Sequence, residues 1–120
     1  MYLQNSIIDG GREYKTVGFI DSTAENRGKL QRFGYITLTA SDDRFLKKGA
    51  VLKAHEFHYF DSTDNGAAFT AKKANGKSWP CIHIKNNCIC GYPHIFYPAN
   101  LDYINKFLSL CDAYKNGGSN

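Results

Sequence analysis

The sequence predicts an α/β fold class, α+β if the chain stands alone, with a mixed sheet, antiparallel hairpins and flanking helices. Several short runs combine β-branched, aliphatic and aromatic residues in the pattern of half-buried strands. Asn-Gly pairs at 65–66 and 75–76 are turn signals that indicate hairpins. Apolar residues recur at helical spacing after Asn100. The pattern therefore favours a sheet with a helix near each end of the chain.

The chain has the size and composition of one folded domain. It holds 120 residues, 42% of them hydrophobic and 14% aromatic, and no apolar run approaches the roughly 18 residues of a membrane span. The net charge of +4 comes from scattered lysines and arginines, without an RNA-binding motif among the aromatic residues. The first residues lack the features of a signal peptide. We therefore expect a cytoplasmic protein with reduced cysteines that binds neither nucleic acid nor a membrane.

In the first third of the chain, the pattern predicts one helix end and two strands. Residues 2–8 have the character of the tail of an amphipathic helix, ended by a Gly-Gly pair. Residues 16–20 are typical of a buried strand, and the polar stretch at 21–28 predicts a loop because it lacks periodicity. Residues 34–39 alternate Tyr and Thr with Ile and Leu, which predicts a strand.

The remaining chain predicts further strands and a C-terminal helix. Residues 51–60 are the longest strand candidate, and Asp-Asn-Gly at 64–66 predicts a hairpin turn into residues 67–73. A strand pair is expected at 81–84 and 88–92, before an irregular segment bracketed by prolines. A helix capped by Asn100 should extend to about residue 114, and a disordered tail should follow at 117–120. The apolar face of this helix is expected to consist of Leu101, Ile104, Phe107, Leu108 and Cys111.

Five consecutive residues concentrate polar chemistry within the longest strand candidate. They are His55, Glu56, Phe57, His58 and Tyr59. Because side chains alternate along a strand, Glu56 and His58 should share one face, and the other three residues the opposite face. A single histidine on a strand is usually structural, whereas two imidazoles beside a carboxylate are typical of a functional site. The cluster therefore predicts a site in this strand.

Three motifs follow one another along the chain: Leu-Gln-Arg-Phe-Gly-Tyr at 30–35, His-Glu-Phe-His-Tyr at 55–59 and Tyr-Pro-His at 92–94. In order and spacing they resemble the C-terminal glutamine amidotransferase domain of cobyrinic acid a,c-diamide synthases. The opening Met-Tyr-Leu is similar to the segment that follows the family's Cys-Gly-Gly nucleophile motif. The resemblance thus implies a start just past that cysteine. The chain departs from the family pattern at Gly91, Pro93 and Phe96.

The resemblance implies that residues 1–116 are part of a glutamine amidotransferase domain, the C-terminal half of a class I, flavodoxin-like fold. In this family a cysteine thiolate attacks glutamine, and a histidine returns the proton to the departing ammonia; the resemblance gives this role to His94. The ammonia amidates carboxylates of a tetrapyrrole, with ATP and Mg²⁺ held by an N-terminal domain in cis or in trans. Because no P-loop occurs here, the chain is expected to hold no cofactor and to be inactive alone.

The roles of the other candidates stay open at this point. Glu56 or His58 is hypothesised to orient His94 or to hold the α-amino group of glutamine, and His55 and Tyr59 are further candidates for glutamine binding. A non-catalytic binding module is an alternative, as is a zinc site, because the chain offers thiol and imidazole ligands at Cys81, His83, Cys88 and Cys90. A homodimer is a further expectation, since half a fold exposes an apolar face.

Overall fold

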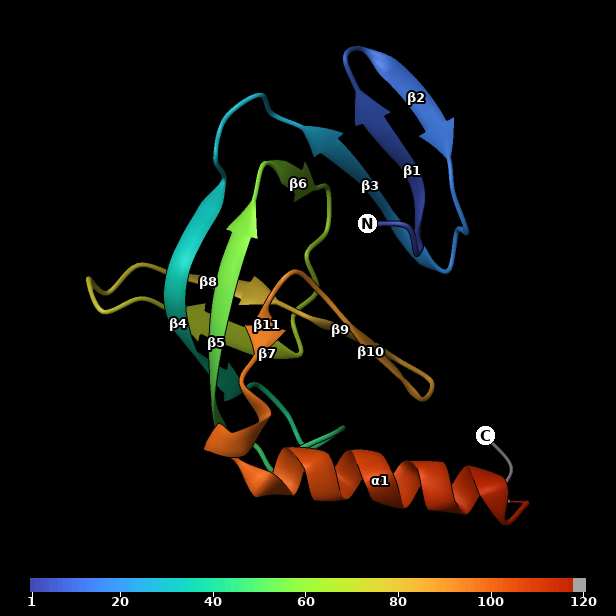
Figure 1. Ribbon diagram of the computed structural model, residues 1–120, viewed down its shortest axis with the longest axis vertical. Helices are drawn as coiled ribbons and strands as arrows, with labels where there is room; N and C mark the ends of the chain where they lie inside the picture. The colour runs from blue at the N-terminus through green and yellow to red at the C-terminus, as the bar shows by residue number, and fades with distance from the viewer. Residues whose placement is uncertain (118–120) are drawn as a thin grey trace.

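The computed structural model describes residues 1–117 as three β-sheets and one α-helix (Figure 1). The structure confirms an α/β chain with a mixed sheet and antiparallel strands, but within the described residues it has one α-helix instead of two. Of the tail predicted at 117–120, only Gly117 belongs to the described residues. Its N–H donates to the carbonyl of Tyr114 at 3.2 Å, just past the helix.

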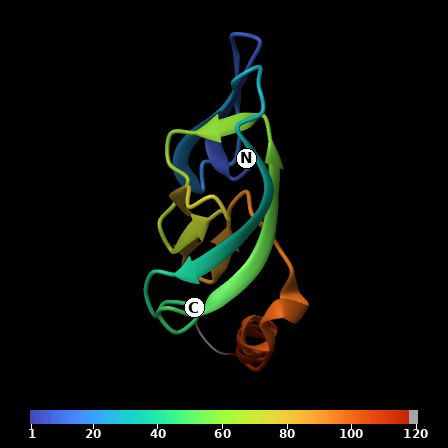
Figure 2. The ribbon, with the colours of Figure 1, turned by 90° about the vertical axis from the view of Figure 1, so that its left-hand side faces the viewer.

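The central sheet is antiparallel throughout, in the order β11-β5-β4-β7-β8. Its strands are β4 (Arg32–Ala40), β5 (Val51–His58), β7 (Phe69–Lys72), β8 (Ser78–Cys81) and β11 (His94–Ile95). The two longest, β4 and β5, run side by side and curve along the molecule (Figure 2). They confirm the strands predicted at 34–39 and 51–60, and the pairing of β7 with β8 confirms the Asn75-Gly76 hairpin.

The second sheet has the order β2-β1-β3-β6, in which β1 and β3 are parallel and the other pairs antiparallel. Its strands are β1 (Gln4–Asp9), β2 (Arg12–Lys15), β3 (Ile20–Asn26) and β6 (Phe60–Ser62). Three predictions for this region were wrong. Residues 2–8 lie mainly in β1 rather than a helix, residues 16–20 are mainly loop, and residues 21–28 are mainly strand β3.

Polar burial explains these errors. The inward side chains of β1 and β3 include Gln4, Ser6 and Ser22, so hydrophobic periodicity does not reveal the strands. The two serines are satisfied inside the protein: the hydroxyl of Ser6 lies 3.2 Å from that of Thr23, and that of Ser22 lies 3.2 Å from that of Thr63. Buried polar groups tolerate desolvation when they are hydrogen-bonded in this way.

The chain changes sheets directly after β5. This strand ends at His58 in the central sheet, and β6 begins at Phe60 in the second sheet, antiparallel to β3. The hairpin predicted from residues 51–60 through the turn at 64–66 was therefore wrong, because β7 pairs with β4 and β8. Gly66 instead forms a parallel bridge with Ile82. The switch places the end of the polar cluster between the two sheets.

The last third of the chain supplies the hairpin and the helix that were expected. The strands β9 (His83–Lys85) and β10 (Cys88–Cys90) pair with each other, and a 3₁₀ turn, η1 (Tyr97–Ala99), precedes α1 (Leu101–Lys115). The side chain of Asn100 caps α1 by accepting from the N–H of Asp102 at 3.0 Å, as predicted.

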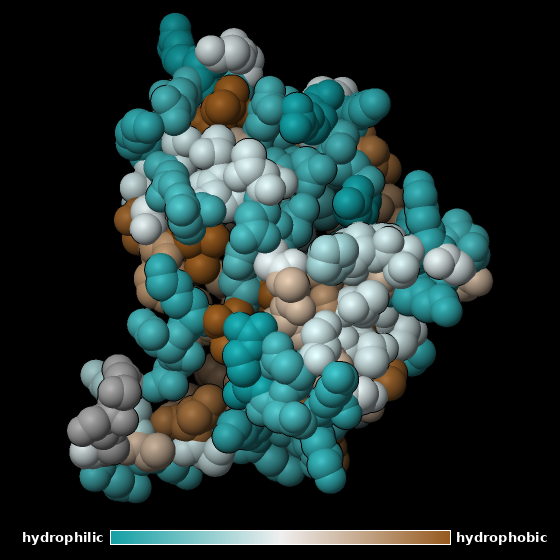
Figure 3. Space-filling view, turned by 180° about the vertical axis from the view of Figure 1, so that it is seen from behind, coloured by the Kyte–Doolittle hydropathy of each residue, from teal (hydrophilic) through white to brown (hydrophobic). Residues whose placement is uncertain are grey.

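The face of α1 that meets the core differs from the predicted one. Tyr103 is buried, 5.0 Å from the ring of Phe45, and Ile104 and Leu110 pack against the core. The predicted face is largely exposed, at Leu101, Phe107, Leu108 and Cys111. Figure 3 shows hydrophobic surface in the region of α1. The large Tyr103 ring, also stacked on Tyr97, sets the rotation of the helix. Within residues 1–117 no helix has the length and apolarity needed to cross a bilayer.

The hydrophobic core lies on one face of the central sheet. Leu38, Leu52 and Phe69 are its largest fully buried apolar side chains. The opposite face of β4 and β5 is open, since Phe33 is 55% exposed and Tyr35 86% exposed. The molecule is 20 Å thick along its shortest axis. The inward-facing residues of β5 thus enter the core side of the sheet, and the outward-facing ones meet solvent.

Candidate functional site

The polar cluster of β5 divides between the two faces of the sheet as its alternation predicts. Glu56 points inward and is only 2% exposed, and the side chain of His58 lies on the same side. On the outer face, the His55 ring makes edge contacts with Phe33 and Tyr35. Phe57 and Tyr59 are exposed there and touch each other. The structure therefore separates Glu56 and His58 from the three outer candidates.

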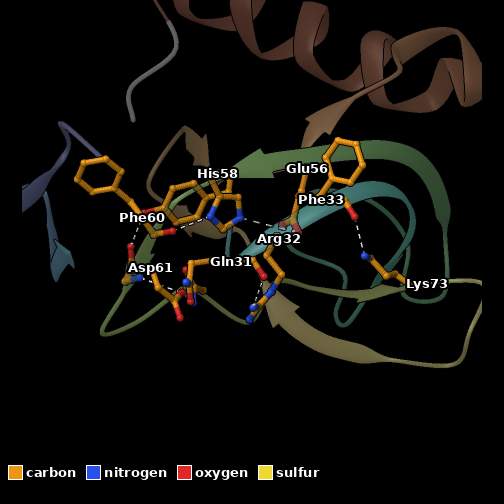
Figure 4. A network of polar contacts seen from close by, with 11 residues as sticks. Gln31, Arg32, Phe33, Glu56, His58, Phe60, Asp61 and Lys73 are labelled. Carbon is orange, nitrogen blue, oxygen red and sulfur yellow. Dashed lines mark hydrogen bonds and ion pairs between the residues drawn. The ribbon is translucent and has the colours of Figure 1, made fainter. Parts of the chain in front are cut away.

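Glu56 and His58 face each other across a small cavity (Figure 4). His58 Nε2 and Glu56 Oε2 are 4.0 Å apart, and neither atom has a hydrogen-bond partner within residues 1–117. His58 Nδ1 lies 2.6 Å from the carbonyl oxygen of Phe60 and donates to it, which leaves Nε2 as an acceptor in the neutral ring. The cavity has a volume of about 10 Å³.

Burial controls the protonation of this pair. It raises the pKa of Glu56, opposed by a hydrogen bond from Trp79 and by the positive charges of Arg32 and Lys73. It lowers the pKa of His58, opposed by the hydrogen bond to Phe60. Each group is thus shifted towards its uncharged form, which is typical of ionisable residues that handle protons in sites.

A second, larger cavity of about 300 Å³ shares Asn65 and Tyr92 with the small one. The His58 ring stacks on Tyr92 with centroids 4.1 Å apart, and the Tyr92 hydroxyl lies 2.9 Å from Ser62 Oγ. Ser62 in turn accepts from Gln4 Nε2 at 2.7 Å. Tyr92, Ser62 and Gln4 line the larger cavity, together with Asn65 and the N-terminal residues. Stacking and hydrogen bonds therefore connect the buried pair to the cavity wall.

Two residues that line the larger cavity also hold buried oxygens without partners. Gln4 Oε1 and Asn65 Oδ1 are buried and lack a hydrogen-bond partner in the described part of the chain. These two residues and Ser62 were missed in the sequence, because they belong to no recognised motif and their spacing follows no periodicity. Arg32, which borders the small cavity, lies in the motif at 30–35.

His94 lies beside the acid-bearing strand and outside both cavities described above, but it lines a third cavity, of about 380 Å³, that shares Cys90, Gly91 and Tyr92 with the cavity of about 300 Å³. It is directly opposite His55 in the pairing of β11 with β5, and its side chain is exposed. Its charge contributes to the lowered pKa of His58. The preceding residues Tyr92 and Pro93 reach the small cavity instead. His94 is thus close to the buried pair, separated from it by the sheet.

The departures from the family motif have structural counterparts. A Cβ atom on Gly91 would lie 3.0 Å from Ile82 Cγ1, so a serine or threonine there would require Ile82 to move. Phe96, another of these departures, is exposed. The segment that carries His94 is thus packed around a residue without a side chain.

The cysteines do not assemble a metal site. Within residues 1–117 no group of three or more His, Cys, Asp or Glu side chains is arranged to hold a metal ion, so the zinc alternative finds no support. Cys81 is buried, and burial raises its thiol pKa to about 12. The same effect raises the pKa of Cys90 to about 11. Both thiols remain protonated at neutral pH and behave as small apolar groups.

Cys81 should make the protein sensitive to alkali. Its thiol pKa rises from 9.0 to about 12 on folding, so the unfolded chain loses this proton first. The stabilisation is complete below pH 9 and is lost as pH rises towards 12, by about 2 kcal/mol between pH 8.5 and pH 10.5. Cys90 adds a loss of its own over this range, so the test is the difference between variants. In urea unfolding at both pH values, the loss in Cys81→Ala should be smaller by this amount than the loss in the protein and in Cys111→Ala, which removes an exposed thiol. An equal loss in Cys81→Ala would contradict the prediction.

Comparisons with known proteins identify relatives of this chain. No family model matches it, and no solved structure matches it. It is 32% identical to the cobyrinate a,c-diamide synthase of Caldanaerobacter subterraneus over 119 residues, 95% of this chain and 26% of that protein. Synthases of the same name from Fusobacterium nucleatum and Listeria monocytogenes are 32% and 33% identical, over 88% and 87% of this chain.

The chain spans about a quarter of the length of these curated relatives. The matches extend along nearly the whole chain, including the motifs at 30–35, 55–59 and 92–94. They confirm the resemblance that those motifs indicate. Over almost all of its length, the chain is a homologue of a quarter-length segment of the cobyrinate a,c-diamide synthases.

Proposed function

We propose that this chain forms part of the glutamine amidotransferase site of an ATP-dependent cobyrinate a,c-diamide synthase. The observation that supports the proposal is the buried pair of Glu56 and His58, which belongs to the motif at 55–59. The pair contacts the larger cavity through Tyr92, on which the His58 ring stacks. Similarity to synthases of that name supports the reaction. In this proposal the parent fold is that of class I amidotransferases, and the present chain supplies its C-terminal half.

Glutamine would occupy the cavity of about 300 Å³. Its amino or amide group would bind at the polar wall that Gln4, Ser62 and Asn65 form. Met1, Tyr2 and Leu3 line the same cavity. A nucleophilic cysteine preceding this Met-Tyr-Leu segment would therefore enter beside the glutamine.

In this proposal, residues of this chain take part in some steps of the reaction, and residues outside it take part in the others. The cysteine thiolate attacks the glutamine amide, ammonia leaves with a proton from His94, and water hydrolyses the thioester. His94 would reach the departing ammonia from its own cavity, which shares Cys90, Gly91 and Tyr92 with the glutamine cavity. Glu56 and His58 act as positioning residues behind Tyr92. ATP and Mg²⁺ bind outside this chain, because it lacks a phosphate-binding Gly-Lys-Ser or Gly-Lys-Thr loop. The tetrapyrrole carboxylates receive the ammonia there.

A chimaera tests this proposal. Residues 1–117 would replace the matched segment of the Caldanaerobacter synthase, and amidation would be measured with glutamine and with ammonium chloride as nitrogen donors. His94→Asn should lower the glutamine-dependent rate by about 10²- to 10⁴-fold, because a general acid–base group is lost. The ammonia-dependent rate should persist, since free ammonia bypasses glutamine hydrolysis.

His55→Asn provides the matched control, because it makes the same change on the outer face of the sheet. It should retain both activities. Equal loss of the two activities in His94→Asn would show a general structural defect, and unchanged glutamine-dependent amidation would exclude His94 from the chemistry. Either result contradicts the assignment.

A further inference from the structure

The small cavity between Glu56 and His58 presents two buried acceptors to each other. The Glu56 side chain is 3% exposed and that of His58 11% exposed. Glu56 Oε2 and His58 Nε2 are 4.0 Å apart, beyond the range of a direct hydrogen bond, and each lacks a partner within residues 1–117. Buried polar atoms without partners are rare, and each such atom costs about 1–3 kcal/mol.

The tautomer of His58 determines what could satisfy both atoms. Nδ1 lies 2.6 Å from the carbonyl oxygen of Phe60, which can only accept, so the proton of the neutral ring lies on Nδ1. Nε2 then carries a lone pair, and so does Glu56 Oε2 in the carboxylate form, which the hydrogen bond from Trp79 and the charges of Arg32 and Lys73 favour against the effect of burial. Two facing acceptors require a molecule between them that donates twice. The cavity of about 10 Å³ has room for one water molecule and no larger ligand.

We propose that one water molecule occupies this cavity, donates to Glu56 Oε2 and His58 Nε2 together, and thereby holds the His58 ring against Tyr92. Glu56 acts through the water as a positioning residue for His58. The stack of His58 on Tyr92 then carries this constraint to Ser62 and Gln4, at the wall of the larger cavity. The inference concerns the chain itself and does not depend on which reaction the chain supports.

The surroundings of the cavity favour water over a cation of similar size. Charged and titratable side chains reach the pair from several elements: Arg32 from β4, Asp61 from β6, Lys73 after β7, Cys81 from β8, Tyr92 after β10 and His94 from β11. The Arg32 guanidinium, which lies 4.9 Å over the Trp79 ring, already supplies positive charge to Glu56. An ammonium ion would add a second positive charge, whereas water adds none.

Nuclear magnetic resonance of the ¹⁵N-labelled chain tests the tautomer. Two-bond ¹H–¹⁵N correlations at pH 7 should show His58 as the neutral ring protonated on Nδ1 and unprotonated on Nε2. Exchange of sodium chloride for ammonium chloride should leave its signals unchanged. Protonation of Nε2, or a saturable shift caused by ammonium, would overturn the water bridge. A crystal structure should show one ordered water between the two atoms, and an empty cavity would also overturn it.

Glu56→Gln tests the positioning role, with Glu25→Gln as the matched control. Glu25 forms an exposed ion pair with Arg27, so the control removes the same charge elsewhere. Loss of the carboxylate should lower the pH midpoint of His58, because the imidazolium loses a nearby negative charge. The ring signals of Tyr92 should shift with it. Unchanged His58 and Tyr92 signals in Glu56→Gln would refute the positioning role of Glu56. If Glu56→Gln does not fold, the tautomer measurement on the unmodified chain still tests the water bridge.

Discussion

Gly66→Ala should lower the free energy of unfolding by on the order of 4 kcal/mol, because two separate penalties combine at this position. Gly66 has a φ of 81°, in the left-handed region that residues with a Cβ atom adopt at a cost. An added Cβ would also lie 2.6 Å from the backbone nitrogen of His83 and closer still to the carbonyl of Ile82. Ile82 has a φ of 67°, unusual for a β-branched residue, so this backbone has little freedom to retreat.

The matched control for this substitution is Gly76→Ala. Gly76 has a φ of 86°, but no atom lies within 4 Å of the position that a Cβ would take. Only the conformational penalty remains, so we expect a loss of about 1–2 kcal/mol. Urea unfolding of both variants measures the difference. Gly66 lies between β6 and β7, and Ile82 lies between β8 and β9. Equal losses in the two variants would show that the close approach of Gly66 to Ile82 does not contribute to stability.

Phe69→Ala should lower the free energy of unfolding by about 3–5 kcal/mol. Phe69 is 1% exposed and lies at the centre of the core, paired with Ala40 on β4 and Cys81 on β8. Truncation removes buried apolar area and leaves a cavity that the surrounding strands fill only in part. Thermal or urea unfolding of the 120-residue chain provides the measurement.

Phe33→Ala makes the same chemical change on the open face of the sheet. Phe33 is 55% exposed and contacts the rings of His55 and Phe57. Loss of partly exposed ring contacts should cost about 0.5–1.5 kcal/mol. If Phe33→Ala were as damaging as Phe69→Ala, the assignment of inner and outer faces to β4 and β5 would be wrong.

The two faces of β5 explain why the candidate site forms where it does. Inward residues are apolar along most of the strand, as at Leu52 and Ala54, and become ionisable at Glu56 and His58. The change coincides with the point where the chain leaves the central sheet for β6. Polar groups are tolerated there because Trp79 donates a hydrogen bond to Glu56 and the carbonyl of Phe60 accepts one from His58. The site thus occupies the junction between the two sheets.

Several elements could be predicted from local sequence because their signals are local. Alternation places Glu56 and His58 on one face of β5, an Asn-Gly pair forms the β7–β8 turn, and Asn100 caps α1. The motifs at 30–35, 55–59 and 92–94 also identify the relatives. Each of these signals depends on residues within one strand, turn or helix end, or on a short motif.

Other features could not be predicted because they depend on partners distant in the sequence. The strands β1 and β3 bury serines and a glutamine whose hydrogen bonds come from other strands. The rotation of α1 depends on Phe45, which lies far from Tyr103 in the chain. The sheet change after His58 carries no turn signal of its own, whereas the Asp-Asn-Gly turn that was expected to make a hairpin connects two different sheets.

By itself the sequence determined the alternating faces of β5, the C-terminal helix and the family relationship, because periodicity, capping and motif order are properties of neighbouring residues. Only the tertiary structure decided that His58 stacks on Tyr92, that its free nitrogen faces Glu56, and that His94 lies outside the cavity between them. Those relationships arise from the pairing of β11 with β5 and from the packing of two sheets, so they depend on distances between residues that are remote along the chain.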